Sequence, residues 1–262
     1  STPLYSSAAS DVYKRQIVRR ADMLGELLKL KNTSIAVSGT HGKTSTTSMM
    51  GSILTEALFD PTLIIGGVVK NLNANALLGK GDIIVAEADE FDKSFLQLSP
   101  THSIITNIDS EHLDCYGSKE NLVKAFNEFA NSTAFYGSII LCVDDSLLKS
   151  IIPNISRPII TYGFSGDAEF QAVNRKFRDY YSFFDVKHKG EFLGSIELEV
   201  PGAHNIKNAL ATIALSIELG IKFKEIKKGL KNFSGVKRRF EIKGEVNKIN
   251  GSRMYSYLTT LE

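Results

Sequence analysis

The sequence of 262 residues has little cysteine and no long hydrophobic run. Its 2 cysteines, Cys115 and Cys142, lie outside any Cys-x-x-Cys or Cys/His ligand spacing, which argues against a zinc module and favours reduced thiols. The longest apolar candidate, residues 63–69, is interrupted by two glycines and falls short of the roughly 18 to 20 residues that span a membrane. The N-terminal segment has no apolar core of the length that a secretory signal requires. We therefore expect a cytoplasmic protein without a membrane span.

The chain also lacks internal repeats, low-complexity tracts and a strong net charge. Its 31 basic and 29 acidic residues give a formal charge of +2, so we expect no nucleic-acid partner. The charges are unevenly placed, because acids dominate residues 82–120 and lysine and arginine dominate residues 222–243. An acidic segment can hold divalent cations and a basic one can meet phosphates. The simpler alternative is that both segments form solvated helix faces.

The first part of the chain has the rhythm of an α/β fold. From residue 31 short apolar runs alternate with helical stretches, which indicates βαβ units and a mostly parallel sheet flanked by helices. Strands are expected at residues 34–38, 63–65, 82–86, 103–108, 138–143 and 158–162. Helices are expected at residues 44–58 and 119–131, the second capped by Ser118.

After residue 162 the pattern changes to strands with little helix between them. Runs at 170–177, 180–187 and 192–199 predict a small antiparallel β subdomain, with a turn at residues 189–190. Helices return at 204–219 and 222–231. The last dozen residues, 250–262, show no pattern from which we would predict a defined element.

The strongest motif is a strand that leads into a glycine-rich loop and then a helix, over residues 34–45. Gly39 and Gly42 allow a tight turn that aims backbone N–H groups inward, and the helix N-terminus adds partial positive charge. Lys43 can reach the β and γ phosphates of a nucleotide, and the Thr44 hydroxyl can ligate Mg²⁺. The loop is shorter than the general phosphate-loop pattern, which would place its first glycine at Val37. These residues predict a nucleotide site.

Two later strands end in polar residues that suit the same site. Glu87 is the first acid after the strand at 82–86, where a carboxylate can reach nucleotide-bound Mg²⁺. His112 follows the strand at 103–108 and can ligate a second cation as a neutral imidazole. Taken alone, acids at a strand end can simply be exposed caps, and a single histidine after a strand is more often a structural hydrogen-bonding residue.

Together these residues resemble the Mur ligase family. The resemblance extends over about residues 17–246 and rests on five segments in the family's order: 39–44, 87–96, 106–116, 202–210 and 235–240. It implies that Lys43 holds the γ-phosphate, that Thr44 and Glu87 bind one Mg²⁺, and that Glu87 and His112 bind a second. Lys43, Glu87 and His112 are the catalytic residues that it implies.

The resemblance also implies binding residues for ATP and for the acceptor substrate. Asn205 and Asn208 would face the adenine and Arg239 the phosphates. The full set implied for ATP is Gly39, Thr40, His41, Gly42, Lys43, Thr44, Ser45, His204, Asn205, Asn208 and Arg239. The set implied for the acceptor is Lys70, Asn75 and Ser94. In the loop at 66–79, Asn73 stands where the family usually has a glycine.

The reaction implied is ATP-driven amide formation through an acyl phosphate, with UDP-N-acetylmuramate and L-alanine as substrates. Family members have domains on both sides of the ATP-binding one. We therefore expect residues 17–32 to be a remnant of a UDP-binding domain, 33–249 to be the central domain, and 1–16 and 250–262 to be unassigned tails. We also expect the C-terminal domain of the family to be missing, so that this piece alone does not form product efficiently.

Two alternatives remain open. A family member that adds a preformed tripeptide to the same nucleotide sugar shares the loop and the acidic segment, although residues 94–98 and 112–116 favour the alanine enzyme. The chain could also be a non-catalytic ATP-binding module. Retention of Lys43, Glu87 and His112 argues against that, because a binding module has little use for a second cation site.

Overall fold

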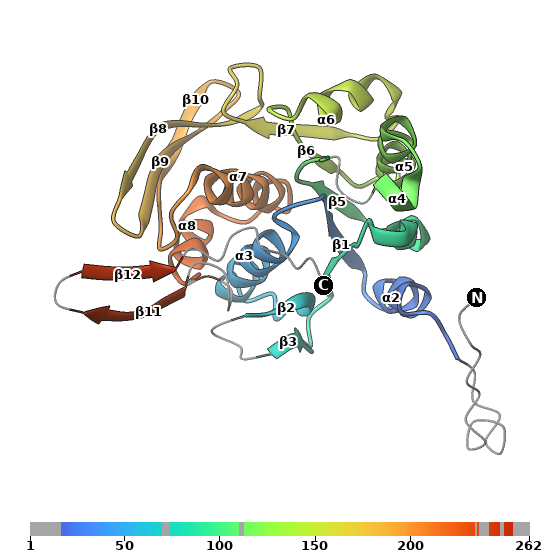
Figure 1. The fold of residues 1–262 in the computed structure, drawn as a ribbon, viewed down its shortest axis with the longest axis horizontal. Coiled ribbons are helices and arrows are strands. Elements are labelled where there is room, and N and C mark those ends of the chain that lie inside the picture. The colour runs from blue at the N-terminus through green and yellow to red at the C-terminus, as the bar shows by residue number, and fades with distance from the viewer. Residues whose placement is uncertain are drawn as a thin grey trace, which may run out of the picture.

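The computed structural model describes residues 17–69, 74–109, 113–233, 235, 241–246 and 249–253. Its main feature is a ten-stranded sheet in the order β10-β9-β8-β7-β6-β5-β1-β4-β2-β3 (Figure 1). Parallel pairing joins β2 to β4, β4 to β1, β1 to β5, β5 to β6, β6 to β7 and β7 to β8. The mostly parallel α/β architecture expected from the sequence is confirmed.

The central strands are short and apolar because both faces of the sheet are covered. In β1, Ile35, Ala36 and Val37 are fully buried. The strands of this part are β1 (Thr33–Ser38), β2 (Thr62–Val69), β3 (Ala74–Leu77), β4 (Ile83–Glu87), β5 (His102–Ile105), β6 (Ile139–Cys142) and β7 (Ile159–Gly163). The antiparallel edge strand β3 was not predicted, and β5 ends earlier than expected.

The antiparallel strands predicted after residue 162 are confirmed, and they continue the main sheet. They are β8 (Phe170–Arg178), β9 (Tyr181–His188) and β10 (Glu191–Leu198). The predicted turn at residues 189–190 joins β9 to β10, and both of its residues have positive φ, 52° at Lys189 and 85° at Gly190. Such a pair of angles fits a tight two-residue hairpin.

Helices cover the sheet on both sides (Figure 1). They are α2 (Arg20–Lys29), α3 (Lys43–Glu56), η1 (Phe91–Gln97), α4 (Leu113–Tyr116), α5 (Lys119–Ser132), α6 (Ser146–Ile151), η2 (Ile152–Asn154), α7 (Ala203–Glu218) and α8 (Phe223–Lys231). The predicted cap of α5 is confirmed, since the Asn121 N–H donates to Ser118 Oγ at 3.2 Å. Helix α6 was missed because it is only six residues long.

Helix α3 carries the phosphate-loop residues and is buried on nearly every side. It packs against α7 and α8 as well as the sheet. At Gly229 of α8 an added Cβ would lie 2.5 Å from the Ile53 Cα, and the Ser52 hydroxyl donates to the Gly229 carbonyl at 2.6 Å. This close approach fixes the C-terminal half of α3 against α8.

Residues 241–253 differ from the expectation. They form a separate antiparallel pair, β11 (Glu241–Val246) and β12 (Ile249–Arg253), so the prediction of no element from residue 250 was wrong for residues 250–253. The polar sequence of β12 gives no alternation that would have revealed it. The division into domains stays a prediction.

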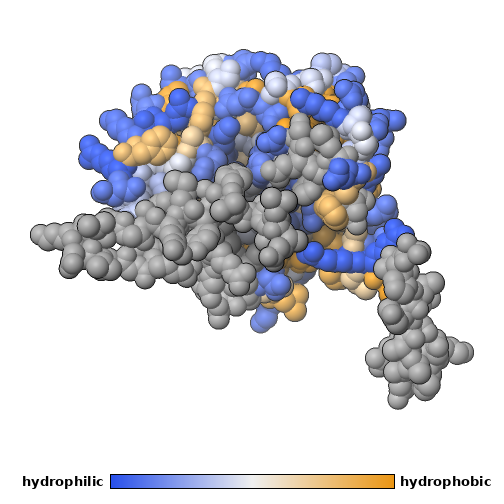
Figure 2. Space-filling view, in the orientation of Figure 1, coloured by the Kyte–Doolittle hydropathy of each residue, from blue (hydrophilic) through white to orange (hydrophobic). Residues whose placement is uncertain are grey.

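The described surface is largely polar on the face shown in Figure 2, with small hydrophobic groups over β8–β10. Exposed aromatic residues of these strands are Phe177, Tyr181 and Phe192. In the part of the chain that the structure describes, no helix has the length and hydrophobicity needed to cross a membrane.

Candidate functional site

The candidate site lies where β1 ends, between its neighbours β4 and β5. The three strands are parallel, so their carboxyl ends meet at one edge of the sheet. Crevices at such an edge are the usual ligand sites of open α/β sheets. The loop at residues 39–42 leaves β1 there and leads directly into α3.

The two loop glycines are required by the backbone. Gly39 has a φ of 128° and Gly42 one of 88°. A Cβ at Gly39 would overlap the Thr106 hydroxyl, and one at Gly42 would lie 2.6 Å from Asn208 Oδ1. No side chain caps α3 at Gly42, so the helix N-terminus is open to an anion. The tight turn predicted between the strand and the helix N-terminus is confirmed, and phosphate binding there stays a prediction.

Residues just after β5 hold this loop in place. The His41 N–H donates to Asn107 Oδ1 at 2.9 Å, and Asn107 Nδ2 donates to the His41 carbonyl at 2.9 Å. The Thr106 hydroxyl donates to the same carbonyl at 2.6 Å. The Thr40 N–H donates to the Asn107 carbonyl at 3.1 Å. Sequence reasoning placed Asn107 in a family segment but did not assign it this bracing role.

Lys43 forms a close ion pair at the mouth of the loop. Its Nζ lies 2.6 Å from Glu90 Oε2 and 3.0 Å from Glu90 Oε1, and it donates to the Gly39 carbonyl at 2.8 Å. The Glu90 side chain is only 2% exposed, and that of Lys43 is 17% exposed. The Tyr116 hydroxyl donates to the backbone carbonyl of Glu90. This pairing was not predicted, because Glu90 is one of several acids in an acidic segment and the sequence does not single it out.

Thr44 and Glu87 meet as predicted. The Thr44 hydroxyl donates to Glu87 Oε2 at 3.2 Å, and the Gly66 N–H donates to Glu87 Oε1 at 2.8 Å. Hydroxyl and carboxylate oxygens are the hard donors that Mg²⁺ prefers, usually with one or two protein ligands and with phosphate and water for the rest. The described residues contain no cluster of three or more His, Cys, Asp or Glu side chains suited to a metal. The pair therefore fits a cation that arrives with a nucleotide.

The start of α7 also comes to the loop. Asn208 is buried, and its side-chain amide stands against Gly42. Asn205 is anchored one turn earlier by a hydrogen bond from its Nδ2 to the Pro201 carbonyl at 2.7 Å. His204 is exposed beside Gly202, whose φ is 107°. Of the predicted adenine residues, Asn208 is thus the one in contact with the loop.

The remaining predicted residues have different outcomes. Lys70, His112 and Arg239 lie outside the described residues. Ser45 is buried in the first turn of α3. Ser94 lies in η1, where its hydroxyl donates to the Asp89 carbonyl at 3.0 Å, and Asn75 is exposed on β3.

A cavity of about 470 Å³ opens beside the loop. Lys43, Gly66, Glu87 and Ser94 line it together with residues of α2 and η1. Arg19 and Arg20 at the start of α2 also line it. The cavity therefore joins Lys43 to two arginines, and the acids Asp22 and Asp89 also line it.

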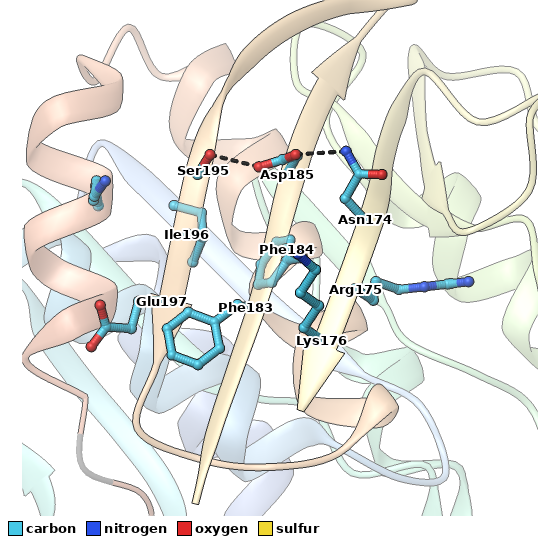
Figure 3. Close-up of a pocket in the computed structure, with 10 residues that line it drawn as sticks. Asn174, Arg175, Lys176, Phe183, Phe184, Asp185, Ser195, Ile196 and Glu197 are labelled. Carbon is cyan, nitrogen blue, oxygen red and sulfur yellow. Dashed lines mark hydrogen bonds between the residues drawn. The ribbon is translucent and has the colours of Figure 1, made fainter. Parts of the chain in front are cut away.

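A second hollow, of about 440 Å³, lies on the antiparallel strands (Figure 3). There Asp185 accepts hydrogen bonds from Ser195 Oγ at 2.6 Å and from Asn174 Nδ2 at 2.8 Å, which lower its pKa. These bonds link neighbouring strands. The hollow has no glycine-rich loop or open helix N-terminus, in contrast to the cavity beside Lys43.

Comparison with known proteins identifies a family model and similar chains. The model of the Mur ligase middle domain matches residues 37–216. A curated relative, the UDP-N-acetylmuramate–L-alanine ligase of Geotalea daltonii, is 47% identical over 233 residues, which cover 89% of this chain and 51% of that protein. The chain thus spans about half the length of the curated relatives it matches.

Solved structures show the same fold. The UDP-N-acetylmuramate-alanine ligase of Thermotoga maritima has a TM-score of 0.79 at 29% identity, covering 92% of this chain and 54% of that one. The UDP-N-acetylmuramate:L-alanyl-γ-D-glutamyl-meso-diaminopimelate ligase of Neisseria meningitides has a TM-score of 0.77 at 24% identity, covering 88% of this chain and 75% of that one. At 24% identity the second likeness shows the fold alone.

Proposed function

Because the chain belongs to the Mur ligase family through its middle domain, we propose that it is the ATP-binding part of a UDP-N-acetylmuramate:L-alanine ligase of peptidoglycan precursor synthesis. The observation that carries the proposal is the loop at residues 39–44, which is tightly turned, open at a helix N-terminus and next to Lys43, Thr44 and Glu87. The 47% identity to a ligase with this activity supports the choice within the family.

The proposed reaction forms an amide in two steps. A carboxylate oxygen of UDP-N-acetylmuramate attacks the γ-phosphorus of ATP, so that ADP leaves and an acyl phosphate forms. The amine of L-alanine then attacks the acyl carbon, and inorganic phosphate leaves as the amide bond forms and the amine loses a proton. Neither step needs a protein nucleophile, so the protein contributes positioning and charge stabilisation.

The described residues divide this work. Backbone N–H groups at the start of α3 bind phosphate oxygens, and Lys43 binds the terminal phosphates. Thr44 and Glu87 would hold Mg²⁺, which supplies positive charge to the transferring phosphoryl group. Asn208, whose side chain lies next to Gly42, binds the adenine base together with Asn205. From the family resemblance we add His112 as a second cation ligand and Arg239 as a phosphate ligand.

The acceptor is proposed to enter the cavity beside the loop. Its reacting carboxylate must come close to the terminal phosphate at Lys43, and the cavity begins there. Arg19 and Arg20 offer positive charge to an anionic nucleotide sugar at the other side. Ser94 lines the same cavity, and Lys70 and Asn75 belong to the segment that follows β2.

Calorimetric titration with a non-hydrolysable ATP analogue and Mg²⁺ tests the nucleotide site. We expect saturable binding by the wild-type chain and its loss in Lys43→Ala. Lys149→Ala is the matched control, because Lys149 forms an exposed ion pair with Asp167 away from the loop. Equal binding by wild type and Lys43→Ala, or no binding by a folded wild-type chain, would refute the proposal.

The amino-acid substrate needs a separate assay. A full-length protein containing this domain should form product with L-alanine and not with the preformed tripeptide that the related muropeptide ligase uses. Product with the tripeptide alone would assign the domain to that ligase instead.

A further inference from the structure

The phosphate-binding lysine is already paired with a buried acid. Both Glu90 carboxylate oxygens lie within hydrogen-bond distance of Lys43 Nζ, at 2.6 and 3.0 Å. A second carboxylate lies beside the loop, because Glu87 accepts a hydrogen bond from the Thr44 hydroxyl. Lys43, Glu87 and Glu90 together therefore carry one net negative charge at the point where phosphates bind.

Separating Glu90 from Lys43 would be unfavourable, because Glu90 is buried. Its side chain is 2% exposed, and its backbone carbonyl is bonded by the buried Tyr116. Removing one partner of a buried ion pair leaves an uncompensated charge, which is strongly unfavourable. Lys43 is therefore expected to stay on Glu90 when a nucleotide binds.

The geometry of the ammonium allows this. Lys43 Nζ has three protons, and its two shortest contacts are to Glu90 Oε2 at 2.6 Å and to the Gly39 carbonyl at 2.8 Å. The other contacts, to Glu90 Oε1 at 3.0 Å and the Thr40 carbonyl at 3.4 Å, are longer. The third proton can turn to a phosphate oxygen while the two short bonds remain.

We propose that Glu90 is a positioning residue that holds Lys43 at the loop and neutralises it, and so makes nucleotide binding depend on a divalent cation. The inference rests on the proposed function. A phosphate oxygen bonded to Nζ would lie within about 6 Å of the Glu90 carboxylate, a distance at which like charges repel appreciably. A cation bound with the phosphates removes most of that repulsion.

The first test measures the affinity for the ATP analogue with Mg²⁺ and with EDTA, in wild type, Glu90→Gln and Glu56→Gln. Glu56 is the matched control, because it also pairs with a lysine, Lys228 at 3.4 Å, but outside the loop. In Glu90→Gln we expect the ratio of the two dissociation constants, without and with Mg²⁺, to fall about ten-fold. An unchanged ratio in Glu90→Gln would overturn the inference.

A second test needs no nucleotide. We expect Lys43→Met to lower the melting temperature by leaving the Glu90 carboxylate unpaired, and Glu90→Gln added to Lys43→Met to raise it again. A further fall in the double variant would overturn the pairing. The ratio of the dissociation constants in the first test separates this role from a merely structural one. Loss of folding would weaken binding equally with and without Mg²⁺ and would leave that ratio unchanged.

The two proposals fail in different ways. If the wild-type chain binds the analogue and the Mg²⁺ dependence is the same in Glu90→Gln, only the role of Glu90 is refuted. If a folded wild-type chain binds no analogue under either condition, the proposed function is refuted and the role of Glu90 with it.

Discussion

Replacing Asn107 by alanine should weaken nucleotide binding indirectly, through the shape of the loop and not through a contact with the nucleotide. The side chain makes two hydrogen bonds to the backbone of His41, from the His41 N–H and to its carbonyl, both at 2.9 Å. Each such bond contributes about 0.5 to 1.5 kcal/mol net, so their loss should cost about 2 kcal/mol in the stability of the turned loop. If the loop must regain this shape to bind phosphate, the affinity for the ATP analogue falls about 30-fold.

Calorimetry on Asn107→Ala measures this loss, and Asn131→Ala is its control. Asn131 is also half-buried and bonds backbone groups, the Asn127 and Asn154 carbonyls and the Ser156 N–H, far from the loop. Both variants should lower the melting temperature, but only Asn107→Ala should lose affinity. Equal affinities in the two variants would show that bracing by Asn107 does not set the loop geometry.

Three further predictions concern packing, pH and thiol chemistry. Gly229→Ala should destabilise the fold by about 1 to 3 kcal/mol in denaturant unfolding, because its Cβ would lie 2.5 Å from the Ile53 Cα. Burial lowers the pKa of His102 despite the opposing charge of Glu218, so the unfolded chain binds a proton more readily. The free energy of unfolding should therefore fall as pH drops below about 6.5, by at most about 1.4 kcal/mol per pH unit from this residue. Burial raises the pKa of Cys142 to about 11, so a thiol reagent at pH 8 should label the partly exposed Cys115 first and Cys142 only on unfolding.

Each of these has a control within the chain. Gly166→Ala should be nearly neutral, because the closest atom to its Cβ would be Gln171 Nε2 at 4.0 Å. In the wild type the Ser138 N–H donates to His102 Nδ1 at 3.1 Å. His102→Asn keeps an acceptor for this N–H but removes the titrating group, so it should flatten the slope of stability against pH. Cys142→Ala should leave the rapid labelling phase unchanged. Three results would contradict these arguments. They are a Gly229→Ala variant as stable as wild type, an unchanged slope of stability against pH in His102→Asn, and loss of the rapid labelling phase in Cys142→Ala.

The sequence predicted the parts of the site that depend on neighbouring residues. The phosphate loop, the helix that follows it and the acid Glu87 after a strand are local patterns, and the structure brings Thr44 and Glu87 together as predicted. The pairing of Lys43 with Glu90 was not predictable in this way. It depends on how the segment after β4 folds back over the loop, and Glu90 reads in the sequence as one acid among several in an acidic segment.

The same reasoning explains why residues 106–107 were predicted as strand. They follow the buried apolar run of β5 in the sequence. The structure ends the strand at Ile105 because the next two side chains turn to the loop, where Thr106 and Asn107 bond the backbone of His41. Hydrophobic periodicity records burial and not the partner of a polar group, so it cannot show this change.

The order of strands determines which of these residues can act together. Lys43 follows β1, Glu87 ends β4 and Asn107 follows β5. The order β5-β1-β4 brings the carboxyl ends of these three strands side by side. Glycine at Gly39 then lets the loop pass between the two flanking strand ends, where a Cβ would overlap Thr106. Charge at the loop is therefore controlled from the β4 side and loop shape from the β5 side. Because the two sets of contacts share no side chain, variants of Glu90 should alter the Mg²⁺ dependence of binding, whereas variants of Asn107 should weaken binding equally with and without Mg²⁺.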